Sequence, residues 1–455
     1  MYNGIGRAEK LMKKASYERE LYIDKFVRNS NISGASVFLV SGTQDAQPKY
    51  YVDTLIYRYL RNRTDECAVY SSLDERLSNP RRNHEDDINR ILEVVRSAPE
   101  KKFYFIAHEA FFTDTAKRAF AQVLCQCPNS AFIVIGTSLS KRKEFYEWVE
   151  ELKSGYSDDS QIHVHEIKLF PFGLQEYREI LGDENATIEK YLDSCGIPEL
   201  CRRDIATQDK RLCELIPRRI DTILKKDGID YNPKLSNWLI DYLMLHLGEP
   251  VSVRQLCDAL STKMFASHSA MSNHLQRLCE YYLFYRLPRY DINRGKEIET
   301  GACYFLADHS YRRARLGVST NDNNCLYKNL VAVELMRRNL DDKVFVGVHY
   351  GNQIDFVVVK SSDSSCRYVQ VCKSEKEAIA AAESLLKIHD AYPKYVIGRT
   401  RQETYQYKGV KIIDIERFLT PDVITRNDYH FTRSTAKDIS DKVVEYVNYI
   451  QREGL

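Results

Sequence analysis

The sequence predicts a multidomain α/β protein, and three observations lead to this fold class. The chain has 455 residues, a length at which roughly three domains of ordinary size are expected. Hydrophobic residues make up 44% and charged residues 29%, a globular composition that excludes a disordered, collagen-like or coiled-coil chain as a whole. Short apolar runs alternate with amphipathic helical patterns in the first part of the chain. This alternation predicts βαβ units and a parallel sheet.

A charged helix is expected over residues 1–30, followed by an α/β domain over residues 31–181. Helical patterns over residues 86–98 and 115–127 separate runs that have the form of buried parallel strands. These runs are Val37–Val40, Phe103–Ala107, Ala131–Ile135 and His163–Phe170. Residues 182–230 contain helical patterns without a strand, so a helical unit is expected to follow the sheet.

A different order of elements follows over residues 231–310. Helices are expected at 238–248, 251–260 and from 268, and the last helix runs into a strand. The turn Ile292-Asn293-Arg294-Gly295-Lys296 then leads to a second strand near 302–308. Three helices followed by a two-stranded hairpin is the order of a winged helix-turn-helix.

The rest of the sequence predicts a small α/β domain over residues 311–419 and a charged, partly helical tail over residues 420–455. In the small domain, a helix at 327–339 precedes three strands, a second helix and a fourth strand. The strands are expected at 343–350, 353–359, 368–372 and 393–398.

Charge and cysteine content limit the partners and the compartment. The chain has 66 Lys and Arg against 64 Asp and Glu, a net charge of +2, so any nucleic-acid surface must be a local patch. None of the twelve cysteines forms a CxxC pair, and most lie in apolar runs, as reduced buried thiols do. No apolar run approaches the roughly 18 residues of a membrane span. We therefore expect a soluble cytoplasmic protein without a membrane partner.

Several segments, taken in order, resemble a prokaryotic family of AAA-type ATPases over about residues 5–419. They are LFPFGLQEYREIL, CGIPEL, RRIDTILKKDGID, YRLPRYDINRGKEI, NLVAVELMRR, NQIDFVVV and YVQVC. The resemblance implies a P-loop-like parallel sheet, a helical lid over residues 182–230, a winged helix, and a C-terminal domain shaped like a PD-(D/E)XK restriction nuclease. It also implies ATP and magnesium as cofactors.

The phosphate loop departs from that family. A P-loop follows the pattern GxxxxGK[ST], in which backbone N–H groups wrap phosphate, the lysine neutralises it and the hydroxyl holds magnesium. Here the pattern begins at Gly42, and Gln47, Pro48 and Lys49 stand at the second glycine, the lysine and the hydroxyl residue. A shift by one residue would make Lys49 the lysine, but Tyr50 would then replace the hydroxyl and Pro48 the glycine.

The strand ends near this loop are altered as well. Family members end one strand with an Asp-Glu pair that orders magnesium and polarises the attacking water. Here His108 replaces the aspartate, and imidazole is a poor magnesium ligand. Glu109 remains, either as a catalytic carboxylate or as a solvated strand end. Thr137 belongs to a preserved sensor-like turn after the next strand.

The C-terminal domain offers an incomplete nuclease site. A PD-(D/E)XK site uses two carboxylates for magnesium and a lysine that assists the water. The corresponding residues are Glu334, Asp355, Gln370 and Cys372, whose side chains are expected to converge at one end of a small sheet. Cysteine cannot act as the lysine. A structural or interaction role is therefore favoured over a magnesium nuclease.

The winged helix is the best remaining candidate for a preserved function. The expected recognition helix carries Asn273 and Arg277, and the hairpin adds Arg289, Arg294 and Lys296. These residue types bind bases and phosphates. The alternative is a module that serves only packing or protein contacts.

The sequence thus predicts a degenerate, non-hydrolysing AAA-type protein that acts as a DNA-binding or protein-assembly scaffold. ATP and magnesium are implied by the resemblance alone, and we expect both to be lost. The alternatives are an active ATPase that uses Lys49 and Glu109, and, third, a magnesium-dependent nuclease. Self-association and protein partners remain open.

Overall fold

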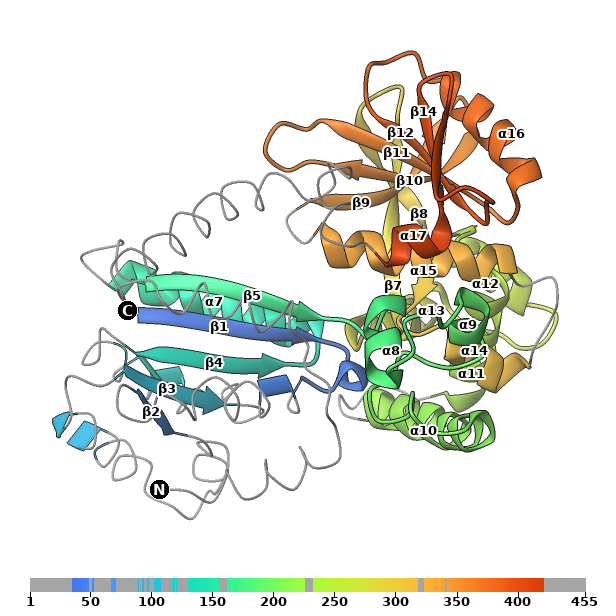
Figure 1. Ribbon diagram of the computed structural model, residues 1–455. Coiled ribbons are helices and arrows are strands. Elements are labelled where there is room, and N and C mark those ends of the chain that lie inside the picture. The colour runs from blue at the N-terminus through green and yellow to red at the C-terminus, as the bar shows by residue number, and fades with distance from the viewer. Residues whose placement is uncertain are drawn as a thin grey trace, which may run out of the picture.

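A computed structural model of the chain is drawn in Figure 1. It describes residues 35–48, 51–52, 67–70, 102–107, 130–155, 162–225, 232–317, 323–339 and 342–420, together with single residues between 89 and 124. The expectations for the N-terminal helix, for the tail from 421 onward, and for Lys49, His108 and Glu109 lie outside the described residues.

Five parallel strands form the first sheet, in the spatial order β2-β3-β4-β1-β5. The strands are β1 (Ala35–Gly42), β2 (Cys67–Tyr70), β3 (Lys102–Ala107), β4 (Ala131–Gly136) and β5 (Ile162–Leu169). The four predicted apolar runs lie in β1, β3, β4 and β5, and β2 is an additional strand that the sequence did not predict. Consecutive residues of β1, Val37–Val40, are all fully buried, so both faces of this central strand are covered, which explains its continuous apolar run.

Helix α7 (Leu139–Gly155) packs on β1 and β4 and covers one face of this sheet. Side chains of β1, β4 and β5 form an apolar core that includes Phe38, Val40, Ile133 and Leu169. The carboxyl end of β1 points toward the helices that follow the sheet (Figure 1). The loop after β1 is therefore placed against the middle of the molecule.

Three helices follow the sheet, α8 (Leu174–Leu181), α9 (Ile188–Leu192) and α10 (Ile205–Lys225). Gly182 ends α8 in the left-handed conformation, φ +65°, as is common for a glycine after a helix. The Thr187 hydroxyl caps α9 by accepting from the N–H of Lys190. In the described part of residues 182–230, for which the sequence predicts a helical lid, the structure contains the helices α9 and α10 and no strand.

Residues 231–310, which we call the winged-helix region after the sequence prediction, contain three helices followed by a two-stranded hairpin. Its helices are α11 (Pro233–Leu245), α12 (Val253–Leu260) and α13 (His268–Glu280), and its hairpin strands are β7 (Phe284–Asp291) and β8 (Lys296–Leu306). A two-residue strand, β6 (Pro250–Val251), pairs with β8. Ser252 and Gln255 form a capping box that begins α12.

From residue 310 onward, in what we call the C-terminal region, the described residues form six strands and four helices. The helices are α14 (Ser310–Leu316), α15 (Asn323–Arg338), α16 (Glu375–Leu386) and α17 (Ile415–Leu419). The strands are β9 (Lys343–His349), β10 (Asn352–Val359), β11 (Cys366–Cys372), β12 (Lys394–Gly398), β13 (Thr404–Tyr407) and β14 (Val410–Asp414).

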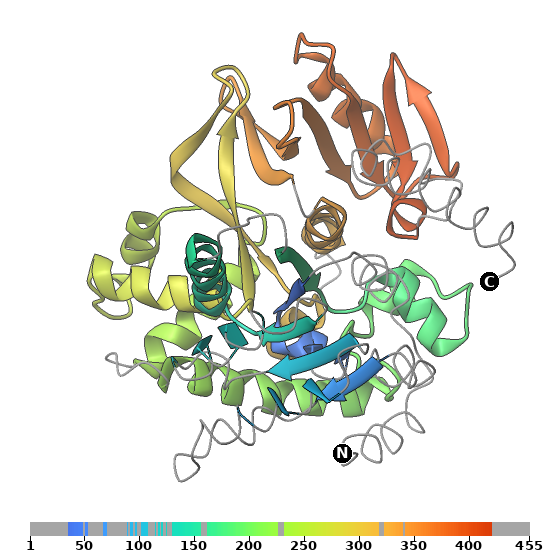
Figure 2. The same cartoon turned by 90° about the vertical axis from the view of Figure 1, so that its left-hand side faces the viewer.

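One nine-stranded sheet joins the winged helix to the C-terminal region, in the order β13-β14-β12-β11-β10-β9-β7-β8-β6. The connection is the parallel pairing of β7 with β9, in which Tyr290 lies opposite Gly347. Figure 2 shows the long β7–β8 hairpin beside the strands of the C-terminal region. The sheet therefore crosses position 310/311, at which the sequence predicts a domain boundary. A shared apolar core runs from Phe172 through the winged helix to Leu419.

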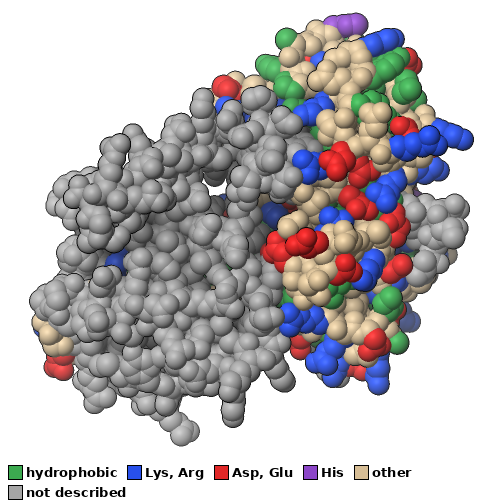
Figure 3. Space-filling view, in the orientation of Figure 1, with side chains coloured by type: hydrophobic (Ala, Val, Ile, Leu, Met, Phe, Trp, Pro, Cys, Tyr) green, Lys and Arg blue, Asp and Glu red, His purple; other side chains and the backbone are tan. Residues whose placement is uncertain are grey.

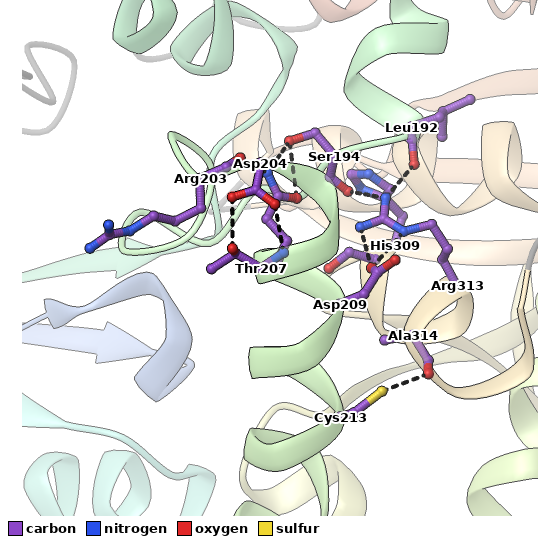
Figure 4. Close-up of polar contacts among 12 residues, drawn as sticks. Leu192, Ser194, Arg203, Asp204, Thr207, Asp209, Cys213, His309, Arg313 and Ala314 are labelled. Atoms are coloured by element: carbon purple, nitrogen blue, oxygen red, sulfur yellow. Dashed lines mark hydrogen bonds and ion pairs between the residues drawn. The ribbon is translucent and has the colours of Figure 1, made fainter.

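A polar junction connects the helices after the first sheet to α14 (Figure 4). The Arg313 guanidinium donates to the carbonyls of Leu192 and Ser194, at 3.3 and 2.7 Å, and forms an ion pair with Asp209. His309 is buried beside them, and burial lowers its pKa, so the imidazole is neutral at pH 7. The arginine satisfies two carbonyls that the helices leave without intrahelical donors.

Within the described residues, no helix has the length and the apolar character that crossing a bilayer requires.

Candidate functional site

The loop that follows β1 is the place where the resemblance implies a nucleotide. Gly42 ends β1 with φ +138°, and a Cβ on it would lie 2.2 Å from the carbonyl oxygen of Leu169. A glycine is therefore required here because β1 and β5 approach closely. This requirement is independent of any phosphate.

The loop closes on itself as a 3₁₀ turn over Gln44–Ala46. The N–H of Ala46 donates to the Thr43 carbonyl, and the N–H of Gln47 donates to the Gln44 carbonyl, each at 3.0 Å. The N–H of Asp45 donates to the Thr43 hydroxyl at 3.4 Å. Pro48 has no N–H and begins the next helical turn. Each backbone donor from Asp45 to Gln47 thus already has an acceptor inside the loop.

Two side chains fasten the loop to distant elements, and we call these two hydrogen bonds the loop clasp. The Tyr311 hydroxyl, in α14, donates to the Asp45 carboxylate in a very short contact. The Gln47 amide donates to the Glu199 carboxylate at 3.1 Å. Two carboxylates thus meet at the loop, that of Asp45 from the loop itself and that of Glu199 through the clasp. Sequence reasoning missed Tyr311 and Glu199, because Tyr311 lies 266 residues from Asp45 and Glu199 lies 152 residues from Gln47.

A second polar cluster lies on the same end of the sheet, around Glu166 of β5. Its carboxylate accepts from the Ser41 hydroxyl at 2.6 Å, from the Arg142 guanidinium at 2.8 and 2.7 Å, and from Tyr146 at 3.0 Å. Burial alone would raise the pKa of Glu166, but the hydrogen bonds from Arg142 and Ser41 hold it below its ordinary value. Both carboxylate oxygens are occupied, so Glu166 is an ionised structural anchor.

The predicted sensor-like turn connects to the winged helix. Thr137 is half-buried, and the Ser138 hydroxyl caps α7 by accepting from the N–H of Lys141 at 3.3 Å. The N–H of Ser140 donates to the Glu280 carboxylate of α13 at 2.6 Å. A carboxylate at the first turn of a helix is favourable because the helix dipole is positive there. The contact fixes α13 against the first sheet.

In the nuclease-like cluster, the structure brings Asp355 and Gln370 together. The Asp355 N–H donates to the Gln370 side-chain oxygen at 3.2 Å, and the N–H of Val371 donates to the Asp355 carboxylate at 2.8 Å. The second Asp355 oxygen lies 2.6 Å from the Lys328 ammonium, on α15. A β-bulge lies between Ile354 and Val357, where these side chains accept hydrogen bonds from backbone N–H groups of the neighbouring strand. Sequence reasoning missed Lys328, since it lies outside the family's strand motif.

Glu334 has different partners. Its carboxylate accepts from Arg337 at 2.7 Å and from Arg338 at 2.6 Å, and these arginines also bind the carbonyls of Pro171 and Phe418. These contacts turn Glu334 toward α8 and α17, whereas the sequence predicted that it meets Asp355. Cys372 is buried in an apolar cluster, and burial raises its pKa to about 11. Of the expected four residues, two are therefore in contact.

A metal site is not formed by the residues that the structure describes. No group of three or more His, Cys, Asp or Glu side chains in them could hold an ion. The Asp355 and Glu334 carboxylates already bind protein cations. These residues do not fit a magnesium ion as placed, because magnesium requires free oxygen ligands.

The predicted DNA contacts of the winged helix fall in three environments. Arg277 is only 8% exposed, on the side of α13 that faces the core, and Asn273 and Arg289 are half-buried. Arg294 and Lys296 are exposed at the hairpin turn, where Arg294 lies 3.6 Å from Asp291. Over residues 231–310, eight Lys and Arg side chains balance eight Asp and Glu side chains. The described part of the surface in Figure 3 likewise shows both charges interspersed.

Three comparisons place this chain among known proteins. The family model described as "Domain of unknown function (DUF8612)" matches residues 185–322, from the helices after the first sheet through the winged helix to α14. An "Uncharacterized protein" from Haemophilus influenzae is 23% identical over 341 residues, which are 73% of this chain and 81% of that protein. A chain in "Structure of Drosophila ORC bound to GC-rich DNA and Cdc6" is 11% identical, with 69% of this chain and 94% of that chain covered. Its TM-score is 0.23, a weak structural similarity.

Proposed function

We propose that this protein is a non-hydrolysing relative of AAA-type ATPases that acts as a scaffold for DNA or protein partners. The observation that carries the proposal is the closed loop after β1. In it, the donors of Asp45, Ala46 and Gln47 bind acceptors of the loop itself.

The position of the loop supports this interpretation. In open parallel sheets, ligands bind outside the carboxyl ends of the strands, where neighbouring connections diverge. The carboxyl end of β1 is such a place, because the chain continues from β1 to distant β2 and crosses from β4 over β1 to β5. The chain thus has the location of a nucleotide site while the loop there is filled by its own contacts.

The carboxylates at the loop after β1 repel a phosphate group. Asp45 and Glu199 bring two carboxylates to the loop, and Pro48 contributes neither a donor nor a positive charge. Two like unit charges 4 Å apart repel by about 4 kcal/mol at an effective dielectric constant of 20. Phosphoryl transfer depends on positioned cations and donors, so a loop with this chemistry is unsuited to it.

Direct contacts take over the mechanical role of a nucleotide in this proposal. The loop clasp connects the loop to Glu199, next to the helices after the sheet, and to Tyr311 of α14. An ATPase would couple these parts through the bound nucleotide. Here these direct contacts hold them together without a nucleotide, as a scaffold requires.

The test is nucleotide binding and turnover by the full-length protein. We expect no calorimetric heat and no rise in Tm with ATP and magnesium, and no turnover above a Lys49→Ala control. Turnover that disappears in Glu109→Gln would contradict the proposal and establish the active ATPase, the alternative in which Lys49 and Glu109 form an unusual site.

A further inference from the structure

Lys168 lies near the carboxyl end of β5 and places its ammonium group against aromatic rings. The Nζ atom is 5.3 Å from the ring centre of Phe170 and 5.7 Å from that of Tyr285. Among the described residues, the ammonium has neither a hydrogen bond nor an ion pair. The side chain is half-buried, and burial lowers the pKa of the amine. Ring faces attract a cation, but the three N–H donors of an ammonium require oxygen acceptors.

Tyr282 provides a second donor without an acceptor in the same cluster. The side chain is 2% exposed, and its hydroxyl has no hydrogen-bond partner in the part of the chain that the structure describes. Its ring lies 6.1 Å from the ring of Tyr285, which also faces the lysine. The charges of Glu166 and Arg142 act on the Tyr282 hydroxyl and on the lysine amine alike. Two unsatisfied donors therefore belong to one polar cluster.

The backbone of Tyr282 is in a conformation that a tyrosine disfavours. The residue follows the end of α13 with φ +56°, in the left-handed region where glycine is usual after a helix. Its N–H donates to the Cys279 carbonyl at 3.0 Å, a contact that a glycine would make without strain. Packing among Phe170 and Tyr285 accounts for an aromatic ring here, but a phenylalanine would pack as well. The hydroxyl at a strained position remains to be explained, and such positions are concentrated at ligand sites.

This cluster is separate from the loop after β1. Lys168 and Glu166 are two residues apart in β5, so their side chains share the face on which Glu166 bonds Arg142 of α7. The next residue, Leu169, lies on the other face, in the apolar core that contains Ala46 of the loop. A ligand at Lys168 is therefore distinct from a nucleotide in the loop.

The charges around the cluster leave one cation unbalanced. Arg142 and Glu166 neutralise each other through two hydrogen bonds. Glu280, the other acid near Tyr282, accepts from a backbone N–H in the first turn of α7 at 2.6 Å. Lys168 keeps its positive charge without a counter-ion. An ammonium and a hydroxyl donor are together complementary to an anion with oxygen acceptors.

We propose that Lys168 and Tyr282 bind a small oxyanion, such as sulfate, phosphate or a small carboxylate, between the first sheet and the end of α13. The ammonium supplies the charge, and the tyrosine hydroxyl donates a hydrogen bond. The exposed part of the Lys168 side chain gives a small ion access from water. The bound ion connects β5 to the turn after α13 and so stabilises this junction. The site goes beyond the scaffold proposal and does not depend on it.

The experiment is calorimetric titration of the full-length protein with sodium sulfate and with sodium acetate, at an ionic strength held constant with sodium chloride. We expect saturable binding of one ion per chain. Lys168→Met should weaken binding about tenfold or more, because it removes the charge and keeps the length of the side chain. Tyr282→Phe should weaken it about tenfold, because one donor to a charged acceptor is lost. The matched control is Lys143→Met, at a lysine of α7 that is 79% exposed, and it should bind within about twofold of wild type.

Three results would overturn the inference. If wild type shows no saturable heat, rings and water alone accommodate Lys168. If Lys168→Met and Tyr282→Phe bind like wild type, the ion lies elsewhere, and loss of binding in Lys49→Ala would then indicate the loop after β1. If binding is the same when the chloride is replaced by more sulfate or acetate but chloride alone gives equal heat, the site does not select oxyanions. ATP turnover decides the non-hydrolysing proposal in every case.

Stability separates a binding defect from a folding defect. Without added oxyanion, Lys168→Met and Tyr282→Phe should not lower Tm, because each removes a donor that has no acceptor in the folded protein. Sulfate raises Tm in general because it is excluded from protein surfaces, and this effect is common to all variants. The additional rise in wild type over Lys168→Met reports the site. An equal rise in both proteins would contradict the proposal.

Discussion

At the scale of single residues, Asp355 and Lys328 are an ion pair whose two members differ in burial. The Asp355 carboxylate is buried, whereas the Lys328 side chain is 23% exposed. Burial raises the pKa of Asp355 in spite of the lysine. The lysine can turn toward water when its partner is removed, but the carboxylate cannot.

We therefore predict that Lys328→Met costs about 3–5 kcal/mol of unfolding free energy at pH 7, because it leaves a buried charge without a partner. Asp355→Asn should cost less than about 1 kcal/mol, since an amide oxygen can still accept from Val371. Urea unfolding of both variants is the measurement. Equal costs would show that Lys328 contributes packing alone.

The pH dependence of this pair has a definite sign. The folded pKa of Asp355 is raised above the ordinary 3.8, so the folded state holds the proton more tightly than the unfolded state. Its contribution to stability is full below 3.8 and declines as pH rises through the raised value. Wild type should therefore lose stability relative to Asp355→Asn as pH rises from about 4. An opposite slope would mean that Lys328 lowers the pKa.

The alternative that the protein is a nuclease is also decided by single residues. With Asp355 bound to Lys328, Glu334 to two arginines and Cys372 buried, none of these three side chains is free to hold magnesium or activate water. A supercoiled plasmid should stay intact with magnesium or manganese. Nicking that Asp355→Ala abolishes would establish a nuclease.

At the scale of elements, the loop clasp is the contact that most directly distinguishes this chain from the ATPase family that its sequence resembles. Tyr311→Phe removes one hydrogen bond to a carboxylate and should cost about 1.5–3 kcal/mol. Asp45→Asn combined with Tyr311→Phe should cost less than the sum of the two single changes, because both act on one bond. Denaturant midpoints of the four proteins give the coupling, and additive costs would show that the clasp is absent in solution.

Opening the clasp should not restore nucleotide binding. The donors of Ala46 and Gln47 would remain bound within the turn, and Pro48 would still lack an N–H. This variant therefore separates two explanations of a silent nucleotide site. A rise in Tm with ATP and magnesium in Tyr311→Phe alone would indicate a functional loop that the clasp merely blocks.

Elements with a strong local pattern could be predicted from the sequence, and contacts between distant segments could not. Buried runs such as Val37–Val40 identify central strands because both faces of such strands are apolar. Strands β2, β13 and β14 were not predicted. They have only four or five residues each, which carry too little pattern, and β13 is half-exposed.

Period-2 alternation predicted that Gln370 and Cys372 share one face of their strand; in the structure the Gln370 side chain accepts from the Asp355 N–H, whereas the Asp355 carboxylate meets the Val371 N–H and Lys328. The alternation gave no information about Lys328, which reaches Asp355 from a helix.

At the scale of the whole molecule, the apolar cores do not follow the domain boundaries that the sequence predicts. The helices after the first sheet, the winged helix and the C-terminal region share one apolar core, and the first sheet has another. Residues that share a core unfold together. We expect the winged helix and the C-terminal region to melt in a single calorimetric transition.

A substitution of Gly347 tests this prediction. A Cβ at this position would lie 2.6 Å from Val357 and 3.0 Å from Ile292, in the pairing of β7 with β9. Gly347→Val should cost about 1–3 kcal/mol or more and split the transition in two. Lys343→Ala, at an exposed position of β9, is the control. A transition that was already split in wild type would contradict the shared core.

The pairing of β7 with β9 also determines how this protein can be dissected. A fragment that ends after α14 would carry the winged helix with one side of β7 uncovered, and its N–H and C=O groups would form an open strand edge. Such edges recruit further strands, and the outcome is aggregation or a swapped dimer. A fragment that extends through β9 covers β7 but leaves β9 as the open edge, because β9 pairs with β10 in the whole chain. A fragment without a new open edge therefore keeps the C-terminal strands. If the C-terminal region is deleted from the gene, the remaining protein should therefore be insoluble.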